Sequence, residues 1–290
     1  MSKLYYYVHT GHRVGLDKFR RSVSIIRSLG EDIDITLLCS DFRIAHVAKE
    51  FGIKNSVGID VIRNIPYIAH HGDKLIFDSD EANPIMLDDM RKFFSTFIRL
   101  SDDKDDVKLD KEYLISPYIQ KDGVCNALVI DDKYFEQTEK TVKISFFYGD
   151  DDYEKDLERN LSLLDGLEPV LQLGFYYFLD YEDELKKKFI DFFEFEDYDE
   201  MIQKTEILIT ASPQAALENL ASGGKPIYIQ RIDYPTHFEE LFGKFGIPII
   251  KNYNNKQLVL QIETINKQEY KKLEKSSNKI TKFIKDNLNL

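Results

Sequence analysis

The stretch over residues 207–229 limits what this chain can fold into more than any other part of it. It reads as an apolar strand, an N-cap at Ser212, a proline at the first helical position, one short helix, a glycine stop and a second apolar strand. Such a strand–helix–strand unit builds a parallel sheet. Because the helix starts at the carboxyl end of a strand, its free amides are expected to face the crevice where anions bind. Phosphate is therefore the first ligand to expect.

The same alternation of apolar strands and helices runs along the rest of the chain. It covers the first part up to Leu100 and restarts with an apolar strand over 142–148. We therefore predict two successive Rossmann-like α/β domains, each a doubly wound parallel sheet. The predicted domains are residues 1–139 and residues 140–290, with the boundary near Glu139.

Composition limits the partners of the chain. Its 290 residues, 43% of them hydrophobic, suffice for two domains with a core each. The formal net charge of −12 argues against nucleic acid or an anionic membrane as the main partner. Only Cys39 and Cys125 occur, so neither a disulfide framework nor a cysteine metal site is indicated. The chain enters a strand at Leu4 without an apolar leader, and no apolar run is long enough for a transmembrane segment, so a cytoplasmic protein is expected.

Four stretches resemble motifs of the nucleotide-sugar enzymes with the GT-B fold. The likeness is greatest to the UDP-sugar hydrolase of pseudaminic acid biosynthesis, a relative of the peptidoglycan N-acetylglucosaminyltransferase. The stretches are Gly11-His12 with Arg20-Arg21 behind it, and the strand ends at 75–79, 97–103 and 146–151. The resemblance implies two domains facing a cleft, with the nucleotide on the second domain and the sugar directed toward His12 on the first.

Two features depart from the family pattern. Gly149 is followed by three acidic residues where the family has a second glycine, and these charges are expected to repel a nearby diphosphate. Pro213 removes one donor amide from the phosphate-facing helix. The Ser212 hydroxyl and the amides of Gln214 and Ala215 remain, so they are the predicted diphosphate donors.

His12 is the predicted catalytic base. It follows Gly11 in a loop after the first strand, where an imidazole can take a proton from water that attacks an anomeric carbon. The alternative is a loop histidine that only makes a structural hydrogen bond. Arg13 belongs to a basic cluster suited to a phosphate or a carboxylate, and the alternative is a solvated helix face. His9 is expected to be structural or auxiliary.

Two further residues of the second domain are predicted to bind substrate. Glu218 lies in the second turn of the helix that Ser212 caps, where the resemblance implies a hydrogen bond to the ribose hydroxyls. The alternative is an exposed helix acid. His237, at a helix start, is predicted to contact a phosphate or a sugar, and the alternative is that it caps its own helix.

Acidic residues follow the apolar strand over 74–78. Asp78, with Asp80 and Glu81, is predicted to orient a water molecule or a sugar hydroxyl, and Asp78 is assigned to the catalytic site. A metal is the weakest alternative, because a hard cation needs several converging oxygens and no loop here has a spaced ligand pattern. No metal and no other cofactor is therefore predicted.

These patterns together predict a nucleotide-sugar hydrolase, with UDP-sugar as the substrate implied by the resemblance. Ser212, Gln214 and Ala215 stabilise the departing diphosphate in this hypothesis, and His12 activates the attacking water. A glycosyltransferase of the same fold is the first alternative, in which an acceptor hydroxyl replaces water. A sugar-binding relative with a degenerate nucleotide site is the second alternative, motivated by the acidic turn and by Pro213.

Overall fold

The computed structural model describes residues 2–81 and 83–289, and contacts divide the chain into two compact units. The first unit combines Met1–Gly11, Lys18–Asp131 and Ser276–Leu290, and the second combines His12–Asp17 with Asp132–Lys275. The chain therefore passes from one unit to the other at four places. We retain Glu139 as the proposed boundary between the two sequence domains.

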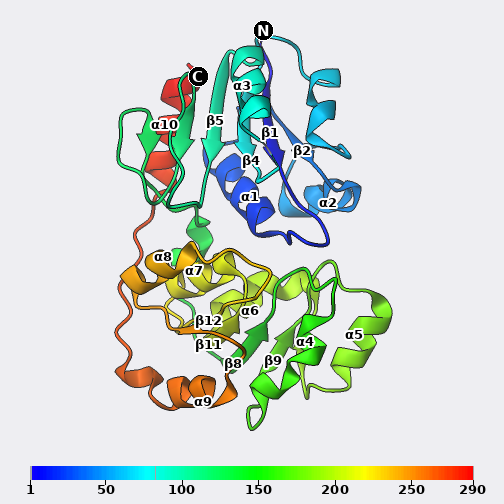
Figure 1. The fold of residues 1–290 in the computed structure, drawn as a ribbon, viewed down its shortest axis with the longest axis vertical. Helices are drawn as coiled ribbons and strands as arrows, with labels where there is room; N and C mark the ends of the chain where they lie inside the picture. The colour runs from blue at the N-terminus through cyan, green and yellow to red at the C-terminus, as the bar shows by residue number, and fades with distance from the viewer. Residues whose placement is uncertain (1, 82, 290) are drawn as a thin grey trace. The chain divides into compact units, whose positions relative to one another are not determined.

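The first unit contains a parallel sheet of seven strands in the order β3-β2-β1-β4-β5-β6-β7 (Figure 1). The strands are β1 (Leu4–Val8), β2 (Ile35–Cys39), β3 (Asn55–Gly58), β4 (Lys74–Asp78), β5 (Thr96–Leu100), β6 (Tyr113–Ile115) and β7 (Val124–Cys125). All of their pairings are parallel, and Tyr6 of β1 stands between Leu37 of β2 and Ile76 of β4. Every residue of β1 is buried, as expected for a central strand with both faces covered.

Helices connect these strands and supply the rest of the first unit's core. They are α1 (Asp17–Leu29), α2 (Phe42–Val47), α3 (Pro84–Phe93) and α10 (Ser277–Leu288), with 3₁₀ helices at Ala48–Phe51 and Ile62–Tyr67. The α10 helix returns to this unit from the far end of the chain and buries Ile280, Ile284 and Leu288. Its Phe283 ring packs edge-on against Tyr113 of β6.

The second unit contains a parallel sheet of six strands in the order β10-β9-β8-β11-β12-β13. The strands are β8 (Val142–Phe147), β9 (Val170–Gln172), β10 (Phe192–Phe193), β11 (Thr205–Thr210), β12 (Ile227–Ile229) and β13 (Ile249–Ile250). Numbered from its own first strand, each sheet begins 3-2-1-4-5-6. That order identifies a doubly wound Rossmann-like sheet with a switch point between its first and fourth strands. The predicted fold class of two such domains is confirmed.

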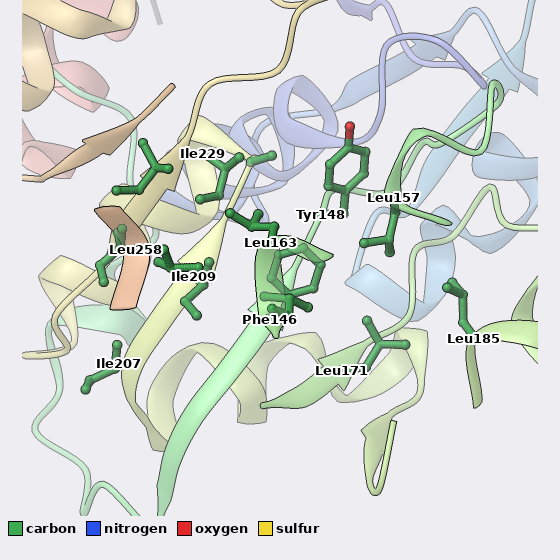
Figure 2. Packing of buried hydrophobic residues seen from close by; sticks show 14 of the residues in the cluster. Phe146, Tyr148, Leu157, Leu163, Leu171, Leu185, Ile207, Ile209, Ile229 and Leu258 are labelled. Carbon is green, nitrogen blue, oxygen red and sulfur yellow. The ribbon is translucent and has the colours of Figure 1, made fainter. Parts of the chain in front are cut away.

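The core of the second unit lies between this sheet and its helices. The helices are α4 (Asp156–Arg159), α5 (Leu179–Lys186), α6 (Tyr198–Lys204), α7 (Pro213–Ala221), α8 (Phe238–Phe245) and α9 (Asn255–Glu263), with 3₁₀ helices at Asp132–Phe135, Leu161–Leu164, Phe195–Asp197 and Ile265–Lys267. Figure 2 shows the core cluster, which includes Phe146 of β8, Ile209 of β11 and Leu171 of β9. The Tyr148 ring joins this cluster, and its hydroxyl points away from the other labelled side chains.

The strand–helix–strand prediction for residues 207–229 is confirmed. β11 leads into α7 and then into β12, and β11 pairs with β12 in parallel. The Ser212 side chain caps α7 by accepting a hydrogen bond from the Ala215 amide, and Pro213 takes the first helical position. No helix among the described residues is long and apolar enough to cross a bilayer.

Candidate functional site

The carboxyl ends of β8, β11 and β12 form the switch-point edge of the second unit. β8 leads into the acidic turn at Asp150–Asp152, β11 leads into the capped start of α7, and β12 leads into Arg231. Ligands of open α/β sheets bind outside this edge. The side chains gathered here therefore define the candidate site.

The start of α7 holds a carboxylate that comes from the segment His12–Asp17 of the same unit. The Ser212 hydroxyl donates to Asp17 Oδ1 at 2.7 Å, and the Gln214 amide donates to Asp17 Oδ2 at 3.2 Å. The Ala215 amide donates to Ser212 Oγ at 3.0 Å. The positive end of the helix dipole adds to the attraction for this charge. The donors predicted to hold an anion thus hold one, and it belongs to the chain itself.

Glu218 lies one turn further along α7 and is buried. Tyr198 Oη donates to its Oε2 at 2.7 Å, and Gln214 Nε2 donates to its Oε1 at 2.9 Å. The alternative interpretation of Glu218 as an exposed helix acid is wrong. Its predicted contact with ribose stays a prediction.

Three residues of the segment His12–Asp17 fit closely against the loops that follow β8 and β9. The His12 ring stacks on Phe178 at 5.7 Å and lies 5.1 Å from the Tyr176 ring centroid. The Arg13 guanidinium lies over the Tyr153 ring at 4.7 Å. Gly15 has a φ of +71°, and a Cβ there would lie 2.9 Å from an Asp151 carboxylate oxygen. Both the backbone conformation and the close approach therefore require glycine.

Arg231 neutralises the middle of the acidic turn. Its Nη2 donates to Asp151 Oδ2 at 3.1 Å, its Nη1 donates to the Asp151 backbone oxygen at 2.9 Å, and Tyr234 Oη donates to Asp151 Oδ1 at 2.7 Å. Asp152 instead caps α4, because it accepts hydrogen bonds from the amides of Asp156 and Leu157. Both carboxylates are therefore buried and hydrogen-bonded, and the expected repulsion of a diphosphate by the acidic turn stays a prediction.

Asp151 is expected to make stability depend on pH. Burial raises its pKa to about 6 from an ordinary value of 3.8, although Arg231 and Tyr234 act in the opposite direction. An acid whose pKa is raised by folding stabilises the native state below its unfolded pKa, and this contribution is lost as pH rises through the folded pKa. We expect Asp151→Asn to remove the fall in unfolding free energy between about pH 4 and about pH 6 that this group causes.

Urea unfolding followed by circular dichroism at several pH values measures this dependence. The exposed Asp180→Asn variant is the matched control, since it removes an acid of the same unit without a buried ion pair. A fall between pH 4 and pH 6 that is equal in the wild type, the Asp151 variant and the control would contradict the assignment.

The switch point of the first unit carries a second group of charged side chains. Asp78, at the end of β4, is buried and accepts two hydrogen bonds from Arg21 of α1, at 2.7 Å and 3.2 Å. Arg21 also donates to Asp102 beyond the end of β5. Burial raises the pKa of Asp78 to about 6, against the opposing effect of Arg21 and Lys18. This ion pair joins β4 to α1, and the catalytic role of Asp78 stays a prediction.

His9 belongs to this first-unit group, and its expected structural or auxiliary role stays a prediction. Its Nε2 lies 3.9 Å from Glu81 Oε1, and Tyr7 Oη donates to Glu81 Oε2. Burial lowers the pKa of His9, so the neutral imidazole is favoured. Lys18 Nζ donates to Asp80 Oδ2 at 2.6 Å beside it. His9 is the first residue after β1, and this position is the signal in the sequence for a place at the switch point.

The remaining predicted residues are distributed between the two units. Gly11 ends the first segment of the first unit, whereas His12 and Arg13 group with the second. His237 is the N-cap residue of α8, has no side-chain capping hydrogen bond, and lies 4.7 Å from the Phe238 ring centroid. Its predicted substrate contact stays a prediction. Within residues 2–81 and 83–289, no group of three or more histidine, cysteine, aspartate or glutamate side chains is arranged to hold a metal ion.

The chain has two Rossmann-like parallel sheets, as proteins of the GT-B fold do, and solved structures with that fold match the whole chain. No protein-family model and no curated protein matches the chain. MurG of Acinetobacter baumannii is 11% identical with a TM-score of 0.59, covering 98% of this chain and 99% of its own. The UDP-GlcNAc 2-epimerase of Methanocaldococcus jannaschii, in complex with UDP-GlcNAc and UDP, is 12% identical with a TM-score of 0.64, covering 99% and 100%.

The MnaA–UDP co-structure from S. aureus has a TM-score of 0.65 at 12% identity, and the match covers 100% of this chain and 98% of that one. Matches at this identity define the fold of the whole chain. The narrower likeness to the hydrolase of pseudaminic acid biosynthesis stays a prediction.

Proposed function

We propose that this chain is a nucleotide-sugar hydrolase that acts on a UDP-sugar. The observation that carries the proposal is the carboxylate held at the start of α7 by the Ser212 hydroxyl and the Gln214 amide. These donors lie at the switch-point edge of a doubly wound sheet, where a diphosphate is the usual kind of ligand. In the proposed complex, phosphate oxygens take the place of the Asp17 carboxylate.

The proposed reaction breaks the bond between the anomeric carbon and the diphosphate oxygen. Water attacks the anomeric carbon and gives a proton to the His12 imidazole, and UDP leaves with the electron pair of the broken bond. Donors at α7 then stabilise the charge that develops on the departing diphosphate. His12 and these donors belong to the same compact unit, which supports a joint role.

Solved structures with the same fold support UDP as the nucleotide. The Methanocaldococcus jannaschii 2-epimerase is in complex with UDP-GlcNAc and UDP, and the MnaA structure contains UDP. Since the fold also carries glycosyltransferases and epimerases, the reaction itself has to be measured. Incubation with UDP-GlcNAc, followed by NMR of the products, distinguishes free sugar plus UDP from the 2-epimer of the nucleotide sugar. Release of UDP only when an acceptor is added would assign a glycosyltransferase.

Binding is the first experimental test of this proposal. We expect UDP to raise the thermal unfolding midpoint more than CMP or GDP does, because a ligand that binds only the folded state stabilises it. At a UDP concentration of about one hundred times Kd the expected gain is about 2.7 kcal/mol. We expect Ser212→Asp to abolish the shift, since aspartate still caps the helix but places a negative charge against the diphosphate.

Asn254→Asp is the matched control for this variant. Asn254 is the N-cap residue of α9 and accepts a hydrogen bond from the Gln257 amide, so the same change leaves a capped helix there too. Its UDP response is expected to equal that of the wild type. A wild-type protein whose unfolding midpoint does not change with UDP, CMP or GDP would contradict the nucleotide-site proposal.

A non-catalytic sugar-binding protein is the second candidate, and two contacts favour it. Asp17 occupies the anion donors of α7, and both Glu218 oxygens already accept hydrogen bonds from Tyr198 and Gln214. The polar groups of this site therefore have hydrogen-bond partners within the chain when no nucleotide is bound. This candidate predicts sugar binding without product formation from UDP-GlcNAc and without a UDP-dependent rise in midpoint.

A further inference from the structure

Asp17 makes two hydrogen bonds to the start of α7, and a diphosphate that uses the same donors must break them. Asp17 Oδ1 accepts from the Ser212 hydroxyl and Asp17 Oδ2 accepts from the Gln214 amide, so both oxygens of one anion already use two of the predicted donors. Ser212 and Gln214 are 2% and 5% exposed, so these donors are shielded from solvent while Asp17 is bound to them. An anionic ligand and Asp17 therefore compete for the same donors.

We propose that Asp17 is an internal competitor of the substrate diphosphate, which binds by displacing the Asp17 carboxylate from the start of α7. This inference rests on the proposed nucleotide-sugar function. We call the competition by Asp17 at the same site the gate. Displacement lowers the apparent affinity by the fraction of molecules in which the site is open. A diphosphate carries more charge and more acceptor oxygens than a carboxylate, so it displaces Asp17 more effectively than a singly charged anion does.

A second observation at this edge points to a ligand larger than the carboxylate. The Tyr228 hydroxyl of β12 is buried and has no hydrogen-bond partner within the described part of the chain. Asp17 is the leading charge that raises the pKa of Tyr228, after the effect of burial. A buried hydroxyl without a partner is costly, so a ligand oxygen that reached the Tyr228 hydroxyl would stabilise the complex.

The remaining contacts of residues 12–17 explain how the competitor is kept in place. Arg13 Nη2 donates to Glu154 at 2.9 Å, and Gly15 packs against the Asp151 carboxylate. The His12 ring stacks against Phe178. These contacts position the Asp17 carboxylate without depending on its charge. Neutralising Asp17 is therefore expected to free the donors of α7 while residues 12–17 stay in place.

Isothermal titration with UDP and with inorganic pyrophosphate tests the competition. We expect Asp17→Asn and Asp17→Ser each to lower the Kd for both probes by about tenfold relative to the wild type. Asp180→Asn is the control for the general loss of one negative charge, because Asp180 is an exposed acid of the same unit, on α5, and is not among the contacts of residues 12–17 named above. Its Kd is expected to stay within about twofold of the wild type. Circular dichroism confirms that each variant is folded, and the serine variant keeps a residue suited to a helix start.

The outcomes separate the gate from the proposed function. Tighter binding in both Asp17 variants but not in Asp180→Asn supports the gate. Equal Kd values for UDP in all four proteins would overturn the gate and leave the nucleotide site intact. Equal tightening in Asp180→Asn would reduce the effect to overall charge and would also overturn the gate. No binding of UDP or pyrophosphate to any of the proteins would overturn both proposals.

Discussion

Replacing Arg231 with methionine is expected to destabilise the second unit by about 3–5 kcal/mol. The side chain is 3% exposed and sits between two rings, 4.8 Å from the Tyr148 centroid and 4.1 Å from the Tyr234 centroid. Its guanidinium donates to Asp151 and, through two nitrogens, to Asp233. Methionine fills part of the volume but leaves the buried Asp151 carboxylate without its counter-charge, which is the costly way to break a buried pair.

Native-state hydrogen exchange of amides in β8 and β11 measures this effect, because these central strands report the opening of their own unit. Arg159→Met is the matched control, since Arg159 is 60% exposed and pairs with Asp156 of its own helix. Its expected cost is below about 1 kcal/mol. An Arg231 variant as stable as the Arg159 variant would show that the cation does not hold the acidic turn.

Replacing His12 with alanine is expected to lower kcat for UDP-sugar hydrolysis by about 100-fold or more with little change in UDP affinity. The reason is that the proposed role of His12 is to take the proton from attacking water, whereas the diphosphate is held by groups on α7. Steady-state kinetics with UDP-GlcNAc gives both quantities, and titration with UDP gives the affinity. His46→Ala, at an exposed position on α2, is the control histidine.

His9 offers the sharpest challenge to this assignment. His9 lies beside Glu81, close to Lys18, in the charged group at the switch point of the first unit. Burial lowers its pKa and so favours the neutral form, which can accept a proton. A loss of turnover in His9→Ala, together with a nearly normal rate in His12→Ala, would move the base to His9. Because both variants remove one imidazole each, the comparison does not depend on a general loss of histidine.

The local parts of the fold were readable from the sequence because neighbouring residues determine them. Ser212 and Pro213 mark the start of α7, and the capping hydrogen bond to Ala215 spans only three residues. The alternation of apolar strands with helices likewise indicated two doubly wound sheets before any long-range contact was known. Donors that lie on one short helix could therefore be placed together from their spacing alone.

The partners of those donors were not readable, because they come from distant parts of the chain. Asp17 lies 195 positions before Ser212, and Asp151 lies 80 positions before Arg231. An acidic residue at a helix start, such as Asp17, looks the same in sequence whether its carboxylate faces solvent or another helix. Similarly, three consecutive acids appear repulsive until a buried arginine and a helix start are known to lie against them.

Because α10 belongs to the first unit, the order of synthesis determines which of the two units can fold completely first. The strands of the first unit are synthesised before residue 132, yet the helix that supplies Ile280, Ile284 and Leu288 to their unit follows the whole second unit. At roughly 5–20 residues per second, this delay lasts on the order of ten seconds. During that interval the early strands lack part of their apolar cover, while the second unit already has its own sheet. The part of the protein that is made first is therefore the part that can be finished last.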